Sequence, residues 1–154
     1  MTLKLAAFYL IFASMLLGTS AWSQSEHHKM IKADELKWED VSAMPGAKLT
    51  VLEGALDKQA PLTFRIKFPA NFRIQAHWHP TTEHVTVLSG TLNLGTGDKF
   101  EQSKTKALPA GGFAIMPAKM HHFAWTSEET MLQVHANGPW QVNYVNPADA
   151  PKKK

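Results

Sequence analysis

Short apolar or alternating segments recur at nearly even spacing from Leu36 to Tyr144, and turn residues separate them. Residues 84–94, hinged at Ser89-Gly90, give the clearest hairpin pattern. No segment has a long helical period, and one short helical turn is predicted near residues 33–36. Many short strands predict an all-β sandwich or closed barrel, of which the jelly roll is one solution. The predicted strands are residues 37–41, 49–53, 62–68, 73–79, 84–89, 91–94, 100–104, 112–116, 122–126, 131–135 and 141–144.

The N-terminal segment has the pattern of a signal peptide. Lys4 is followed by an uncharged apolar run over residues 5–17, then by small residues. The run is shorter than the roughly 20 residues that a membrane helix needs, and polar residues follow it directly. We predict a signal peptide over residues 1–23 with cleavage after Ser23, or alternatively after Ala21. The mature protein would then be periplasmic or secreted and would have no membrane segment; an uncleaved anchor is the competing interpretation.

Length and composition indicate one domain that folds without covalent cross-links. The chain has 154 residues and no cysteine, so disulfides, thiolate ligands and cysteine nucleophiles are excluded. The formal charge is +3, and residues 152–154 are all lysine, so the rest of the chain is close to neutral and nucleic acid is not an expected partner. We expect a polar lead-in over residues 24–35, a β domain over residues 36–146 and a disordered basic tail over residues 147–154.

Three metal-ligand side chains occur within the seven residues from His77 to Glu83. In a strand, His77 and His79 would share one face, because successive side chains alternate. Pro80 should end the strand, and the turn after it can bring Glu83 back beside the two imidazoles. One histidine in a strand is usually only a hydrogen-bonded polar residue. Three converging polar groups inside an apolar fold need a partner, so the segment favours a divalent transition metal with open coordination positions.

A second segment opens a strand with Gly111, ends it at Pro117 and begins the next strand at His122. With the first segment, it resembles the cupin family. The first cupin motif, His-x-His, three residues, Glu, six residues, Gly, is met at His77, His79, Glu83 and Gly90 without a gap. The second motif, Gly, five residues, Pro, then His five residues later, is met by the second segment. The two motifs are 20 residues apart, over residues 91–110, and the resemblance covers roughly residues 48–144.

The resemblance implies a single-domain jelly-roll barrel with one metal on His77, His79, Glu83 and His122. Three imidazoles and one carboxylate suit Mn, Fe, Ni, Cu or Zn. A slip of one residue in the strand register would make His121 the fourth ligand in place of His122. His84 should face away from the metal.

Three positions depart from the cupin pattern, and none is a ligand. Asn71 and Lys119 stand where the family usually has glycine, and Thr126 stands where it usually has asparagine. Asparagine tolerates left-handed backbone geometry better than most residues, so the first change is mild. The loop around Lys119 is expected to be reshaped.

His135 has two interpretations that the sequence leaves equal. It shares a strand face with Met131 and Gln133, and a late cupin strand commonly lines the cavity, so it could donate to the metal site or act as a general base. It could equally be a hydrogen-bonded residue at a strand end. Large apolar side chains near the motifs should be mostly core, with a few lining the pocket: Trp78, Phe113, Met116, Met120, Phe123, Trp125 and Trp140.

The leading functional hypothesis is a secreted metal-dependent enzyme acting on a small organic molecule. Cupins with this ligand set include dioxygenases, decarboxylases, isomerases and epimerases, and dioxygenase-like oxidation is the first choice among them. The alternative is a non-catalytic periplasmic protein that binds a metal or small ligand in the same pocket. A third interpretation is a sandwich without metal. Sheet edges and exposed aromatic residues favour a homodimer.

Overall fold

Eleven strands and three short 3-10 turns make up the regular structure of residues 28–152, the part of the chain that this computed structural model describes. The predicted signal peptide over residues 1–23 lies outside it, as do residues 24–27 of the predicted lead-in. Residues 28–31 belong to an N-terminal unit and have no regular secondary structure there. The unit that carries the sheets begins at Lys32. No helix within residues 28–152 is long and apolar enough to cross a membrane.

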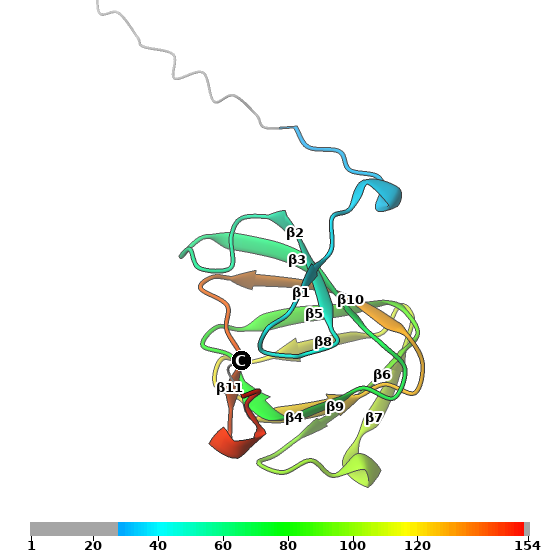
Figure 1. Ribbon diagram of the computed structural model, residues 1–154, viewed down its shortest axis with the longest axis vertical. Helices are drawn as coiled ribbons and strands as arrows, with labels where there is room; N and C mark the ends of the chain where they lie inside the picture. The colour runs from blue at the N-terminus through cyan, green and yellow to red at the C-terminus, as the bar shows by residue number, and fades with distance from the viewer. Residues whose placement is uncertain (1–27, 153–154) are drawn as a thin grey trace, which may run out of the picture. The chain divides into compact units, whose positions relative to one another are not determined.

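Two antiparallel sheets form the domain, as the sequence predicts (Figure 1). The first has the order β1-β2-β3-β10-β5-β8 and the second the order β11-β4-β9-β6-β7. The strands of the first sheet are β1 (Glu39–Asp40), β2 (Lys48–Glu53), β3 (Pro61–Phe68), β10 (Thr130–Asn137), β5 (Glu83–Ser89) and β8 (Phe113–Met116). Those of the second are β11 (Asn143–Tyr144), β4 (Arg73–Trp78), β9 (His122–Trp125), β6 (Thr91–Thr96) and β7 (Lys106–Pro109). Consecutive strands alternate between the two sheets from β3 to β6 and again from β7 to β11, as in a jelly roll.

Alternating side chains along the strands build the core between the sheets. Along β3 the apolar residues Leu62, Phe64, Ile66 and Phe68 are buried, and the residues between them are half-buried. They pack in one cluster with apolar side chains of the second sheet, such as Ile74. This inward face therefore supplies the apolar surroundings of anything that lies between the sheets.

The strand predictions fail mainly at residues 100–104. A 3-10 turn, η2 (Gln102–Lys104), stands there, and the strand comes later as β7. The Thr105 hydroxyl donates to the Gln102 carbonyl at 2.7 Å, and the Lys104 ammonium donates to Glu101 at 2.9 Å. Such local side-chain bonds compete with strand pairing, and they favour the turn here.

The two ends of the β domain also differ from prediction. The strands predicted over residues 37–41 and 141–144 shorten to two residues each. The predicted helical turn is η1 (Ala33–Glu35). The tail predicted to be disordered from residue 147 begins with a 3-10 turn, η3 (Pro147–Asp149). The side chain of Asn146 stabilises that turn by accepting a bond from the Ala148 backbone N–H at 3.1 Å.

The three departures from the cupin pattern have clear local geometry. Asn71 and Lys119 both have left-handed backbones, with φ of 58° and 64°. They therefore adopt the conformation for which glycine is usually needed. Thr126 is fully buried; its hydroxyl donates to the Pro69 carbonyl at 2.8 Å and accepts from the Phe72 N–H at 3.3 Å. These bonds fix the turn that holds Asn71 and leads into β4.

The Thr126→Val variant is expected to lower the free energy of unfolding by about 1–3 kcal/mol, because it keeps the side-chain shape and removes the two part-buried bonds that the hydroxyl makes with the Pro69 carbonyl and the Phe72 N–H. Urea denaturation at constant slope measures this change. The control is Thr86→Val, at a half-buried position in β5, which should stay within about 0.5 kcal/mol of the parent. Equal stability of Thr126→Val and the parent would contradict the proposed role of this hydroxyl in the turn.

Candidate metal centre

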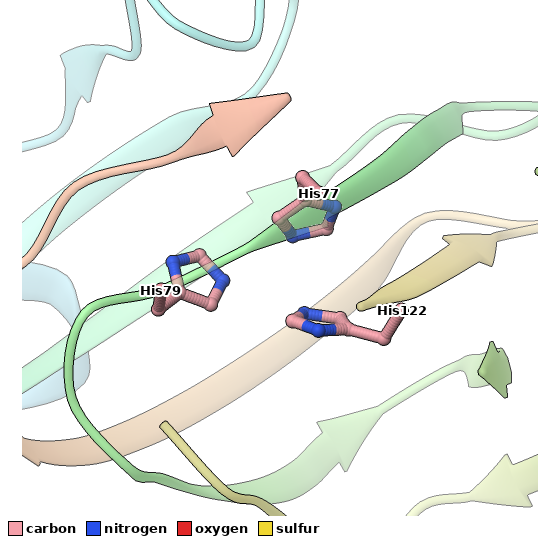
Figure 2. Close-up of side chains that lie close together, drawn as sticks. All are labelled: His77, His79 and His122. Carbon is pink, nitrogen blue, oxygen red and sulfur yellow. The ribbon is translucent and has the colours of Figure 1, made fainter. Parts of the chain in front are cut away.

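His77 and His122 lie directly opposite each other on two paired strands. His77 is in β4, His122 opens β9, and the two residues are register partners. Their rings are 4.2 Å apart between centroids. His79 follows the end of β4, with its ring 4.9 Å from that of His77 and 5.1 Å from that of His122. Figure 2 shows the three rings pointing toward one another, and one nitrogen from each lies within 4.8 Å of the others.

The turn between His79 and Glu83 is tied to the loop of the second motif. The Lys119 N–H donates to the His79 carbonyl at 2.8 Å, and the Ala118 N–H donates to the Thr82 hydroxyl at 3.2 Å. This turn delivers Glu83 as the first residue of β5, in the other sheet. The Glu83 carboxylate therefore approaches His79 from the other sheet, with Oε2 3.4 Å from His79 Nε2, whereas the ligand atoms that lie within 4.8 Å of one another are those of His77, His79 and His122.

Each of the three imidazoles has its Nδ1 fixed by a backbone carbonyl. His77 Nδ1 donates to the Gln75 carbonyl at 2.8 Å, and His122 Nδ1 donates to the Met120 carbonyl at 2.9 Å. His79 Nδ1 donates to the Gln141 carbonyl at 2.8 Å. A carbonyl oxygen only accepts, so the proton of each neutral ring is on Nδ1 and the lone pair is on Nε2. This is the orientation that outer hydrogen bonds give to metal-binding histidines.

Burial keeps these imidazoles neutral. His77, His79, Glu83 and His122 are each 3–5% exposed. Burial lowers the pKa of His79 to about 4, and it lowers the pKa of His77 well below 6.5, with the neighbouring imidazoles adding to the effect. The pKa of His122 is lowered by burial too, while burial raises the pKa of Glu83. Neutral imidazoles at neutral pH are ready to bind a metal without first losing a proton.

The distance between the facing atoms of His79 and Glu83 matches the separation of two ligand atoms on one metal ion. His79 Nε2 and Glu83 Oε2 are 3.4 Å apart. The ring of His79 is neutral and its one proton points to Gln141, so when Glu83 is ionised both facing atoms are acceptors and no ion pair joins them. Two donors that each lie about 2.1 Å from a metal are about 3.0–3.4 Å apart at ordinary coordination angles. The donor set therefore fits a divalent transition metal.

The neighbouring histidines lie outside this group. His121 turns outward, and its Nδ1 bonds Asp98 at 2.7 Å, so the structure brings His122 and not His121 to the other imidazoles. His84 is exposed, as predicted. His135 does not lie beside the three imidazoles. Its side chain is exposed, because Leu132 and Val134 take the inward positions of β10.

His135 is instead a hydrogen-bonded residue of the outer sheet face. Its Nδ1 lies 3.1 Å from the Thr63 hydroxyl and its Nε2 lies 3.1 Å from the Gln133 amide. Met131 and Gln133 share its face, as the alternation of the strand predicts. The sequence leaves both interpretations of His135 open, because alternation alone does not say which of the two faces of β10 points into the cavity.

Trp140, which the sequence predicts only as a core or pocket-lining residue, contacts two of the candidate ligands. Its indole N–H donates to Glu83 Oε1, and its ring stacks on His79 with centroids 5.2 Å apart and planes 17° apart. It stands between β10 and β11 in a loop without regular structure. The only sequence signal is a tryptophan soon after Asn137-Gly138-Pro139, which predicts a turn and leaves the direction of the side chain open.

The cavity at the metal site is small and almost entirely apolar. It has a volume of about 60 Å³ and is walled by both sheets, with side chains such as Phe64, Phe68, Ile74, Leu92 and Val134. Of the apolar residues near the motifs, Met116 and Trp140 line it. Phe113, by contrast, is 55% exposed and faces outward from β8. Among the described residues that line the cavity, the four candidate ligands are the only ionisable ones.

The ChrR cupin-like domain family matches residues 26–141 of the chain. The fold is similar to that of the polyketide cyclase RemF from Streptomyces resistomycificus, at 19% identity over 77% of this chain and 86% of that chain, with a TM-score of 0.65. It is also similar to an RmlC-like cupin from Shewanella frigidimarina NCIMB 400, at 20% identity over 73% and 91%, with a TM-score of 0.57.

A third similar structure comes from Methylibium petroleiphilum PM1 and is described as a candidate acetylacetone dioxygenase. It is 15% identical over 82% of this chain and 86% of that chain, with a TM-score of 0.61. No curated protein matches the sequence. At these identities the three solved structures show a shared fold and leave the activity of this chain to be argued from its own site.

Proposed function

We propose, since the chain belongs to the ChrR cupin-like domain family, that it binds one divalent transition metal and acts on a small organic molecule beside it. His77, His79, His122 and Glu83 would hold the metal. The observation that carries this proposal is the set of three buried imidazoles whose Nδ1 atoms donate to backbone carbonyls, so that their Nε2 lone pairs are free. Export to the periplasm or beyond is part of the proposal and rests on the N-terminal sequence.

The residues present suit Mn, Fe, Ni, Cu or Zn. When bound, such a metal supplies a Lewis acid or a redox centre. The protein contributes the orientation of the ligands and an apolar enclosure that excludes water. That enclosure strengthens electrostatic interactions inside it, because little solvent is left to screen them.

The cavity favours a small substrate with few polar groups. Its volume of about 60 Å³ leaves room beside the metal for a small molecule only. Charge adds a second limit. A divalent ion beside one carboxylate and three neutral imidazoles carries a net single positive charge, and among the described residues no further ionisable side chain lines the cavity. A neutral molecule or a monoanion is therefore preferred over a dianion, whose excess charge would be buried without a partner.

Dioxygenase-like oxidation is the reaction that we place first. Among the described residues that line the cavity, the ligands are the only ionisable ones, so reactions that need a separate acid and base are less well served. Small enolisable ketones and diketones meet the size and charge limits, since each can present oxygen donors as a neutral molecule or monoanion.

Metal analysis of the natively purified protein, followed by oxygen uptake with the metal-loaded protein, tests this function. We expect one metal per chain, and oxygen consumption with small diketones and not with oxalate. Protein that carries no metal and takes up none of the five candidate ions would refute the metal centre. Oxygen uptake with oxalate alone would refute the proposed substrate class.

The second candidate is a non-catalytic protein that binds a metal or a small ligand in the same cavity. The absence of any further ionisable side chain among the described residues of the cavity wall favours it, because a general acid or base beside the substrate is one of the features by which an active site is identified. Calorimetry distinguishes the two candidates. Binding of a diketone to the metal-loaded protein without any conversion would support the binding protein.

A further inference from the structure

Trp140 contacts two of the four candidate ligands at once. Its indole N–H donates to Oε1 of Glu83, and its ring lies nearly parallel to the ring of His79. The next residue, Gln141, accepts the bond from His79 Nδ1 through its backbone carbonyl. The loop segment Trp140-Gln141 therefore orients both the Glu83 carboxylate and the His79 imidazole.

The loop that carries Trp140 is itself fixed. The Trp140 backbone N–H donates to the Leu56 carbonyl at 2.7 Å, and the Gly138 N–H donates to the Ala60 carbonyl at 2.9 Å. The indole also packs edge-on against Phe64, with ring centroids 4.9 Å apart. A side chain held at its backbone, at its ring face and at its ring edge has little freedom to move away from Glu83.

The two oxygens of Glu83 have different partners. Oε1 accepts the indole N–H of Trp140, while Oε2 lies 3.4 Å from the free Nε2 of His79. A hydrogen bond to one oxygen fixes the plane of the carboxylate and occupies one of the two lone-pair sites of that oxygen. Oε2 is the oxygen that faces His79 Nε2.

We infer that Trp140 is a positioning residue that makes Glu83 a single-oxygen ligand, binding the metal through Oε2 while Oε1 stays on the indole. This inference rests on the metal centre proposed above and adds the residue that sets its geometry. Outer partners of metal ligands typically contribute 10–100-fold to metal affinity. The simpler view, that Trp140 only fills the core, predicts no such effect beyond a loss of stability.

The Trp140→Phe variant keeps an aromatic ring over His79 and removes only the indole donor. With Co²⁺ as the probe, we expect its affinity to fall at least about tenfold and its visible absorption spectrum to change, because the carboxylate is free to rotate. Trp125→Phe is the matched control, since it removes an indole bond to the Thr105 hydroxyl away from the site. Co²⁺ affinity and spectrum should match the parent in the control.

A double-mutant cycle with Glu83→Gln separates positioning from packing. If Trp140 acts through the Glu83 carboxylate, Trp140→Phe should cause no further loss of Co²⁺ affinity in a protein that already carries Glu83→Gln. Effects that add in full would overturn the inference, as would a parent-like spectrum and affinity for Trp140→Phe alone. Parent protein that binds no Co²⁺ would instead refute the proposed metal centre.

Nuclear magnetic resonance of the parent protein gives a measurement that does not depend on folding of the Trp140 variant. The indole N–H resonance that moves in Glu83→Gln identifies the bond to the carboxylate. With Zn²⁺ bound, we expect this resonance to stay in its downfield, hydrogen-bonded position. An upfield shift on Zn²⁺ binding would show that Oε1 leaves the indole, and it would overturn the single-oxygen assignment.

Discussion

The His122→Ala variant is expected to bind metal at least about 100-fold more weakly than the parent, a larger loss than removal of an outer partner causes. His122 is one of three buried imidazoles that converge on one point, and it is the only one of them supplied by the second motif. The two others stand on the segment before it, so removal of His122 opens one whole side of the site. Chelator competition with Zn²⁺ measures the change.

His121→Ala is the matched control, because it removes the adjacent imidazole and leaves the site intact. His121 turns toward solvent and bonds Asp98. We expect this variant to bind Zn²⁺ as the parent does and to lose at most about 1 kcal/mol of stability, the usual range for an exposed ion pair. Metal retained in His122→Ala and lost in His121→Ala would reverse the assignment of the fourth ligand.

The spacing of the motifs predicts that His77 and His79 lie together, because that depends on local geometry. The two residues share a face by strand alternation, and a short turn returns Glu83 to His79. The choice of His122 over His121 follows from the register of β9 against β4, where His122 is the partner of His77. Register is fixed by pairing across the sheet, so the sequence alone leaves both residues open.

The misplaced residues have a different cause. His135 faces outward because the neighbours of β10 bury Leu132 and Val134, and that choice between faces is made by the whole sheet. Trp140 reaches Glu83 from a loop, and loop side chains are placed by tertiary contacts that have no period in the sequence. The segment at residues 100–104 has one apolar residue, Phe100, and the local side-chain bonds of Lys104 and Thr105 favour a turn there.

The stability of the metal-free protein is expected to fall steeply as the pH drops from 6.5 to about 4. The pKa of His79 is about 4 in the folded state and about 6.5 when unfolded, so between these values the unfolded chain binds a proton that the folded chain does not. Stability therefore decreases with falling pH, by on the order of 3 kcal/mol for His79 over the whole interval. The lowered pKa values of His77 and His122 act in the same direction.

Glu83 opposes this trend without reversing it. Its raised pKa means that the folded state keeps a proton which the unfolded chain releases above about 4.5, so its contribution to stability is lost as the pH rises. One carboxylate acts against three imidazoles, and the indole bond of Trp140 reduces its shift. Between pH 4.5 and 6.5 the stability of the metal-free protein should therefore rise with pH, as the three histidines dictate.

Urea denaturation at several pH values, with and without Zn²⁺, checks this expectation. Zn²⁺ should raise stability most near neutral pH, because it binds the deprotonated ligands of the folded state, and the gain should vanish as protons displace it. His79→Gln should flatten the profile of the metal-free protein, whereas the exposed His135→Gln should leave it unchanged. If the stability of the metal-free protein is constant from pH 6.5 to 4, burial does not hold the three imidazoles neutral. That result would refute the argument for a preformed metal centre.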